Sequence, residues 1–122
     1  MGYETRLHIG EVYTWTDDNS IRDIALIDLS CAGHSTHTGM LLAAARAAKD
    51  KTYAVPNSGG NYDHEDRYGE PLTAVDIDSL IDAMEADNNN EEYRRFTLAL
   101  AVLRAVKNDP SWRNLVVVQY GY

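Results

Sequence analysis

The chain has little of what staples small secreted domains or anchors proteins in membranes. Its 122 residues include one cysteine, Cys31. A single cysteine excludes a disulfide within the chain and suits a reducing compartment. The N-terminus lacks the apolar core of a signal peptide, and the longest apolar stretch, residues 97–106, is interrupted by Arg104 and too short to span a bilayer. We therefore expect a soluble, cytoplasmic protein that makes no membrane contact.

Basic residues are almost absent from residues 63–92, where Arg67 is the only one. The same window holds eleven of the nineteen acidic residues, so its formal charge is −10, against −8 for the whole chain. A field concentrated in this way repels phosphate backbones and anionic lipid, and it attracts basic protein surfaces or cations. Direct binding to nucleic acid is therefore not expected.

What is present predicts a single α+β domain over residues 1–122. The hydrophobic content of 44% and the eight tyrosines are typical of a globular chain that is long enough to bury a core. Strands are predicted at residues 3–15, 21–30, 52–55 and 115–120. Helices are predicted at 40–49, from Thr73 to the Asn88–Asn90 run, and from there to Val106. The expected architecture is a four-stranded mixed or antiparallel sheet, covered on one face by about three helices.

Apolar patterns place these elements relative to the core. In the first strand the apolar face, by period two, is formed by Leu7, Ile9, Tyr13 and Trp15, while Arg6 and His8 fall on the other face. Residues 24–27 are apolar on both faces, so the second strand is expected inside the sheet, as is the last strand.

The helical segments carry their own start and stop patterns. The run Thr73-Ala74-Val75-Asp76 resembles a capping box and is expected to begin the second helix. The third helix, apolar nearly all round from Phe96 to Val106, is expected to be the central one, and Asn108-Asp109-Pro110 ends it. Residues 56–72, with three glycines and two prolines, form the longest irregular segment.

Acidic side chains are the first candidates for a binding surface. The second predicted helix has one apolar stripe, formed by Ile77, Leu80, Ile81 and Met84. Away from this stripe, three acidic residues fall within roughly 60° of one another: Asp78, Asp82 and Glu85. The preceding loop adds Asp63, Glu65 and Asp66. The alternative interpretation is a solvated face that keeps the protein in solution. As a binding site, these residues would occupy a basic protein surface, one that otherwise binds nucleic acid, so that the protein acts as a charge mimic.

A second candidate site lies at the predicted helix start after Cys31. Backbone N–H groups there, with Gly33 and the hydroxyls of Ser35, Thr36 and Thr38, are suited to a phosphate or carboxylate. Arg67 or Arg94 would supply the cation. The segment is not a P-loop, because no lysine follows Gly39 in the required place. This site predicts the alternative function, sequestration of a phosphorylated nucleotide signal.

A third hypothesis is a metal-dependent or thiol hydrolase built on one cysteine and three histidines: Cys31, His34, His37 and His64. Their spacing matches no standard zinc pattern, and an inert, buried cysteine at a strand end is the more common arrangement. We therefore expect no metal, no other cofactor and no catalytic residue.

Three strings resemble small tailed-phage accessory proteins of unassigned activity: Glu65-Asp66-Arg67-Tyr68-Gly69, Tyr93-Arg94-Arg95-Phe96 and Val116-Val117-Val118-Gln119-Tyr120-Gly121-Tyr122. The resemblance covers about half of the chain. It implies a host-directed or counter-defence role in the host cytoplasm and supplies no catalytic residues. The leading hypothesis from the sequence is thus a non-enzymatic inhibitor that binds a basic surface of a host factor. The assembly state stays open, with a homo-oligomer among the alternatives.

Overall fold

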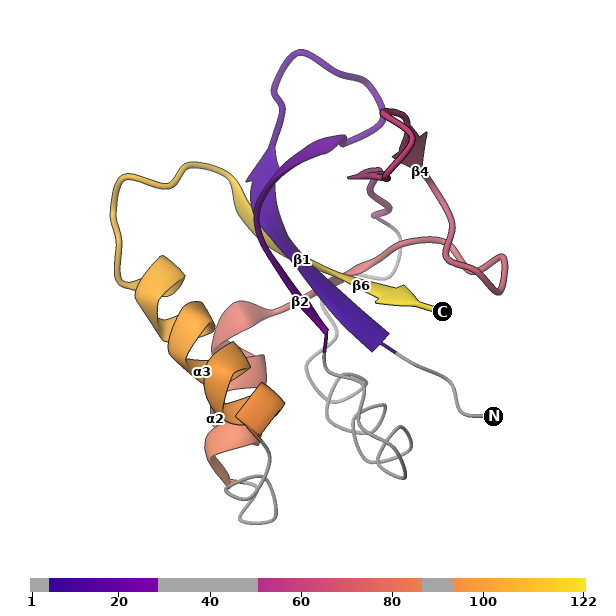
Figure 1. The fold of residues 1–122 in the computed structure, drawn as a ribbon. Helices are drawn as coiled ribbons and strands as arrows, with labels where there is room; N and C mark the ends of the chain where they lie inside the picture. Colours follow the sequence, from indigo (N-terminus) through magenta and orange to yellow (C-terminus); the bar gives the residue numbers. More distant parts are fainter. Residues whose placement is uncertain (1–4, 29–50, 87–93) are drawn as a thin grey trace.

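The computed structural model describes residues 5–28, 51–86 and 94–122. Its main sheet has four antiparallel strands in the order β2-β1-β6-β5 (Figure 1): β1 (Thr5–Val12), β2 (Ile21–Asp28), β5 (Ala74–Val75) and β6 (Leu115–Gly121). A second, two-stranded sheet pairs β3 (Val55–Pro56) with β4 (Tyr62–Asp63). Two helices are described, α2 (Ile77–Ala86) and α3 (Arg94–Lys107).

The two helices lie together on one face of the main sheet (Figure 1). Alternation along β1 sends Leu7 and Ile9 to this face, where both are fully buried. They join one apolar cluster with residues of both helices: Leu80, Ile81, Met84, Ala99, Leu103 and Val106. The stripe of Ile77, Leu80, Ile81 and Met84 read from the sequence is thus the buried face of α2, with Ile77 partly buried.

The opposite face of the sheet is covered by residues 51–72. Val118 and Tyr120 of β6 alternate with Val117, so they point away from the helices. They pack with a second apolar cluster contributed mainly by this segment: Tyr53, Val55 and Leu72. The predicted irregular stretch at 56–72 therefore forms part of a second layer over the sheet, and the hydrogen bond from the Arg67 N–H to Gly121 O, at 3.1 Å, joins it to β6.

Much of the predicted α+β architecture is confirmed, with differences in detail. The sheet is antiparallel throughout, and the helices cover one face of it. The fourth strand of the main sheet is β5, whereas the strand expected at 52–55 is shifted to Val55–Pro56 in the small sheet. The helix expected at 40–49 lies outside the described residues, so two helices are described instead of about three.

The position of β2 differs from the prediction, because β2 is an edge strand of the main sheet and β6 is internal as expected. The apolar residues at 24–27 do not all lie in the core. Ala25 and Ile27 pack toward the helices, whereas Leu26 faces the other way and is 54% exposed. Trp15 does not extend the apolar face of β1. It lies beyond the end of that strand and is 78% exposed.

Both helices also differ from their predicted form. Residues 74–75 form β5, so Thr73 does not cap a helix; Asp76 does, because its Oδ2 accepts the Ser79 N–H at 2.9 Å and the Ser79 hydroxyl at 2.7 Å. The third helix is not central, since it covers one side of the core and leaves Leu98 60% exposed. It ends at Lys107, as predicted. In the described ranges, neither helix has the length and apolar character that crossing a membrane requires.

Candidate functional site

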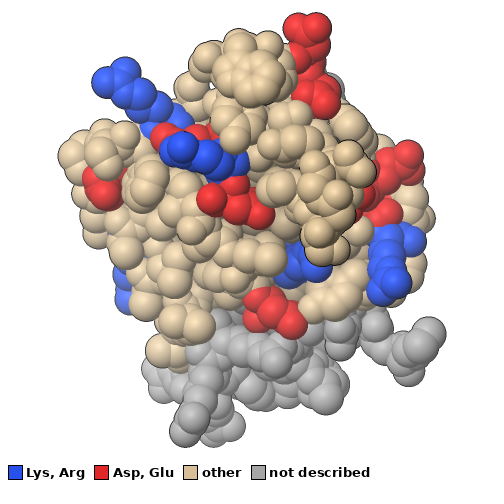
Figure 2. All heavy atoms as spheres, turned by 45° about the horizontal axis from the view of Figure 1, so that its top comes forward, with Lys and Arg blue, Asp and Glu red and all other residues tan. Residues whose placement is uncertain are grey.

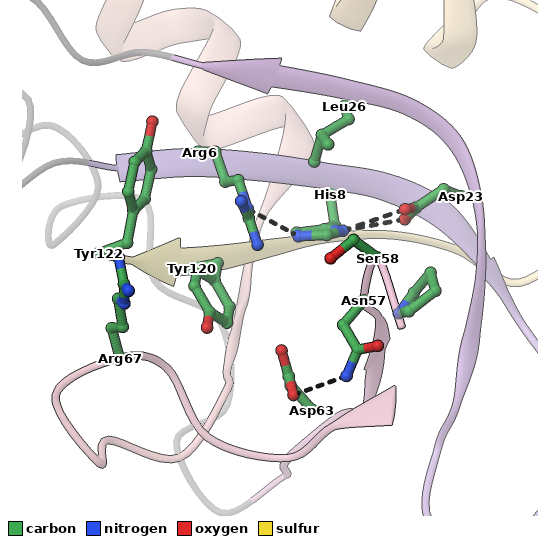
Figure 3. A pocket seen from close by; sticks show the side chains of 11 residues that line it. Arg6, His8, Asp23, Leu26, Asn57, Ser58, Asp63, Arg67, Tyr120 and Tyr122 are labelled. Atoms are coloured by element: carbon green, nitrogen blue, oxygen red, sulfur yellow. Dashed lines mark hydrogen bonds and ion pairs between the residues drawn. The ribbon is translucent and has the colours of Figure 1, made fainter. Parts of the chain in front are cut away.

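A cavity of about 490 Å³ lies on the sheet face opposite the helices, between β1, β2, β6 and the layer formed by residues 51–72 (Figure 3). This volume is in the range of sites that hold small molecules. The sheet contributes Arg6, His8, Asp23, Leu26, Tyr120 and Tyr122, and the covering layer contributes Pro56, Asn57, Ser58, Asp63 and Arg67.

A β-bulge brings Asp23 into this cavity. The register of β1 against β2 passes from Ile9 opposite Ala25 to Gly10 opposite Asp23, so Ile24 is the extra residue on β2. Strict alternation would have put Asp23 on the helix side, because Ala25 points there. Gly10 permits the close approach, since a Cβ at this position would collide with the carbonyl group of Arg22.

His8 links Asp23 to Arg6 at the base of the cavity. The His8 ring is only 1% exposed, and its Nδ1 lies 3.1 and 3.2 Å from the two oxygens of Asp23. Its Nε2 lies 3.2 Å from Nε of Arg6. An arginine N–H can only donate, so Nε2 accepts this bond and Nδ1 carries the proton that is donated to Asp23. The geometry therefore specifies a neutral imidazole in one tautomer.

The guanidinium of Arg6 is held on a second side by tyrosines. Its central carbon lies 4.3 Å from the ring centroid of Tyr120, the residue directly opposite Arg6 in the β1–β6 register, and 5.3 Å from that of Tyr122. Among the described residues, the two terminal nitrogens of Arg6 make no hydrogen bond. The side chain is thus fixed at Nε and across its face, while its N–H-rich end lines the cavity.

The covering layer adds one positive and one negative side chain. Arg67 is held beside the end of β6 by its backbone N–H, which donates to Gly121 O at 3.1 Å, and its exposed side chain lines the cavity. Asp63 accepts a hydrogen bond from Nδ2 of Asn57 at 3.0 Å. With Arg6 and Asp23, the charged groups in the cavity sum to zero, in contrast to the strongly negative chain.

Comparison of the chain with protein-family models, with curated proteins and with solved structures gives no match.

The acidic side chains predicted on the second helix are partly paired with α3. Glu85 lies 2.8 Å from Arg104, and Asp78 forms an ion pair with Lys107. The hydrogen bond that Lys107 donates to Asp78 raises the pKa of Lys107, and the nearby charges of Asp82 and Glu85 raise it further. Bases of the neighbouring helix thus neutralise much of this carboxylate ladder.

The acidic residues of the loop lie on the other side of the sheet from α2, in the layer that covers the cavity (Figure 1). Asp63 lines the cavity and Glu65 is exposed. Asp66 shapes the loop, because its Oδ1 accepts the N–H groups of Tyr68 at 2.8 Å and Glu70 at 3.0 Å. The structure therefore does not join the loop acids and the helix acids into one surface.

The other predicted sites fall mostly outside the described residues. These are Cys31, Gly33, His34, Ser35, Thr36, His37 and Thr38. Arg94 begins α3, but its side chain also lies outside the description. His64 lies 2.8 Å from Asp18, and this contact, after the hydrogen bond from Ser20, lowers the pKa of Asp18. Among the described residues there is no group of three or more potential metal ligands.

Sequence reasoning identified Arg67 as a ligand-binding residue and assigned no role to Arg6, His8 and Asp23. A signal for two of them was present: Arg6 and His8 alternate with the apolar Leu7 and Ile9, which puts two polar side chains on one face of a buried strand. The contribution of Asp23 depends on the bulge, which alternation does not reveal.

Proposed function

We propose that the protein binds a small anionic ligand in the cavity under residues 51–72 and sequesters it without chemical change. The observation that carries this proposal is the state of Arg6. Its guanidinium is fixed by His8 and Tyr120, while its terminal N–H groups line a cavity of about 490 Å³ and make no hydrogen bond within the described part of the chain. A fixed guanidinium binds phosphate or carboxylate groups in a defined orientation, at little cost in side-chain entropy.

The surroundings of Arg6 support binding of an anion in a protein with a formal charge of −8. Arg67 gives the cavity a second cation, and among the described residues its guanidinium has no acidic partner. Neither guanidinium forms an ion pair within the described residues, and together they bring the charge of the cavity to zero in a strongly negative chain. The role expected for Arg67 in anion binding is therefore retained, while the proposed site is moved from residues 33–39 to this cavity.

The same contacts argue for binding and against turnover. An imidazole next to a carboxylate is a common acid–base pair, in which Nε2 takes the proton from a nucleophile. In this protein Nε2 of His8 is occupied by Arg6 at 3.2 Å. The Asp23–His8 pair therefore orients an arginine and leaves no basic nitrogen for a substrate.

Thermal denaturation in the presence of phosphate-bearing small molecules tests this proposal. A ligand that binds only the folded state raises the melting temperature as its concentration exceeds Kd. We expect such a rise for the wild type and an affinity lower by roughly tenfold in Arg67→Gln, because a charge-assisted hydrogen bond is lost. Arg113→Gln is the matched control, since Arg113 is exposed and does not line the cavity. No rise with any anion, or equal losses in both variants, would overturn the proposal.

A second proposal keeps the host-directed, counter-defence inhibitor that occupies a basic protein surface. The observation in its favour is the exposure of three aromatic side chains: Tyr62 and Tyr68 in the loop that carries Asp63, Glu65 and Asp66, and Trp15, which packs against Tyr13. They are 38%, 56% and 78% exposed. Tryptophan and tyrosine are enriched among the residues that dominate binding energies at interfaces. Affinity capture from bacterial lysate at low and high salt, with Trp15→Ala and Glu65→Lys variants, tests it. A partner that both variants retain fully would contradict this role for the loop.

A further inference from the structure

Two opposite charges line the cavity without pairing to each other. Arg67 and Asp63 belong to the same covering layer, yet no ion pair joins them, and among the described residues the guanidinium of Arg67 contacts no acid. Figure 3 places Arg67 next to Tyr122 at one end of the cavity and Asp63 next to Asn57 at another. The cavity is therefore polarised, with a cationic end and an acidic end.

Asp63 is held in a defined orientation by Asn57. The Oδ1 atom of Asn57 accepts the N–H groups of Gly59 at 2.9 Å and Asn61 at 3.2 Å, so its amide cannot turn over without losing both bonds. Its Nδ2 must then face Asp63, where it donates to Oδ1 at 3.0 Å. The second oxygen of Asp63 makes no hydrogen bond in the described part of the chain, and Figure 3 shows the carboxylate directed toward the space near Tyr120.

A ligand that satisfies both ends has an anionic group at one end and N–H donors at the other. The lining of the cavity also includes the apolar side chains of Leu26 and Pro56 and the ring of Tyr120, which suit a flat ring. A carboxylate with a free oxygen accepts hydrogen bonds and cannot donate them when ionised. It therefore favours a ring edge that carries adjacent N–H donors and disfavours one that carries acceptors.

We propose that the ligand is a guanine nucleotide, with its phosphate at Arg6 and Arg67 and the N–H edge of its base at Asp63. This inference rests on the proposed function and specifies the ligand class. Guanine presents two adjacent donors, the ring N–H and the exocyclic amino group, to one carboxylate. Adenine presents a ring acceptor at the corresponding place, so a bare carboxylate oxygen would face a lone pair.

Titration calorimetry with guanosine monophosphate (GMP), adenosine monophosphate (AMP), guanosine and inorganic phosphate tests this ligand class. For the wild type we expect GMP to bind at least about tenfold more tightly than AMP, because one charged hydrogen bond distinguishes them. Guanosine and inorganic phosphate, each of which satisfies only one end, should both bind more weakly than GMP.

The decisive variant is Asp63→Asn. Its amide oxygen still accepts the hydrogen bond from Asn57, so the melting temperature should hold, while an N–H₂ group replaces the free carboxylate oxygen. We expect the preference for GMP over AMP to disappear in this variant and to persist in Glu70→Gln, an exposed acid of the same loop that does not line the cavity. Equal binding of GMP and AMP by the wild type would overturn the guanine assignment and leave anion binding intact. No binding of any phosphate compound would overturn both.

Discussion

At the scale of single residues, His8 is one of three buried polar side chains among the described residues, with Thr5 and Ser20. A buried imidazole is costly to desolvate unless both ring nitrogens find partners. Asp23 and Arg6 supply these partners from β2 and from β1 itself. The three residues therefore form one unit, in which the stability of the pocket floor and the orientation of Arg6 depend on the same bonds.

Removing one member of this unit should lower the free energy of unfolding by more than removing two. In Asp23→Ala the Nδ1–H group of His8 loses its acceptor, and we expect a loss of about 1–3 kcal/mol in the free energy of unfolding. In the double variant His8→Leu with Asp23→Leu the buried Nδ1–H donor is removed together with its acceptor, so much of that loss should be recovered. Anion binding should fall, because Nε of Arg6 has lost its acceptor. Urea denaturation measures both. Asp17→Ala, an exposed acid, is the control, and equal losses in Asp23→Ala and Asp17→Ala would contradict the argument.

Gly10 is the residue that permits the bulge. Because a Cβ would collide with the backbone carbonyl of Arg22, the strands must separate locally in Gly10→Ala. We expect a loss of about 1–3 kcal/mol in unfolding free energy, typical of overpacking, together with weaker anion binding as Asp23 shifts. Gly59→Ala serves as the control, since a Cβ there makes only ordinary contact with Asn57. Unchanged stability in Gly10→Ala, measured by urea denaturation, would show that the bulge does not need glycine.

At the scale of elements, α2 begins at a residue that is both a cap and a titrating group. Hydrogen bonds from the Ser79 hydroxyl and N–H lower the pKa of Asp76 below its ordinary value of 3.8. The cap therefore stabilises the helix fully at pH values above 3.8, and this contribution is lost as the pH falls through the lower pKa of the folded protein.

Asp76→Asn keeps a side chain that can cap the helix and removes the negative charge of the carboxylate. Asparagine caps helices about as well as aspartate, so stability at neutral pH should change little, whereas Asp76→Ala should lose about 1 kcal/mol. Below pH 4 the part of the acid-induced loss that comes from this carboxylate should be absent from Asp76→Asn. Thermal denaturation of the three proteins between pH 2 and 7 measures this. Identical acid profiles for the wild type and Asp76→Asn would contradict the assignment.

The buried faces of the strands and helices could be predicted from the sequence, whereas the pocket could not. Strand alternation predicted the buried pair Leu7 and Ile9, and the spacing of Leu80, Ile81 and Met84 predicted the buried face of α2, because both patterns report local geometry. Register is not local: the bulge that re-aims Asp23 arises from pairing with Gly10, thirteen positions earlier in the chain. The pocket needed that pairing and the return of residues 51–72 over the sheet, so its residues could not be grouped by spacing.

The ion pairs between the two helices lead to a further prediction about the acidic residues of α2. Changing Asp78, Asp82 and Glu85 together to lysine would place two of the new cations beside Lys107 and Arg104. We therefore expect a lower melting temperature at low salt, restored in part at high salt, and not the unchanged fold that an unpaired surface would give. Asp82→Lys alone, at a position without an ion pair within the described residues, is the control. A triple variant as stable as the wild type at low salt would show that the pairs contribute nothing.

At the scale of the whole molecule, the acidic window of residues 63–92 does not gather into one field. Four of its eleven acids lie in the layer over the pocket and four in the segment of β5 and α2, while the remaining three fall outside the described residues. Figure 2 shows one face on which acidic and basic side chains are interspersed across a largely uncharged surface. A strongly negative formal charge thus coexists with a neutral cavity that contains two guanidinium groups.

The most direct test of the central claim, that the protein's ligand site is this cavity, is a titration followed by backbone amide NMR. With increasing GMP, we predict progressive shift changes at residues 6–8, 23–26, 57–58, 63–67 and 120–122, which include every cavity-lining residue that has a backbone N–H. Residues 77–86 and 97–107 should remain unchanged, because the sheet separates them from it. The absence of any change, or changes confined to the two helices, would contradict the account.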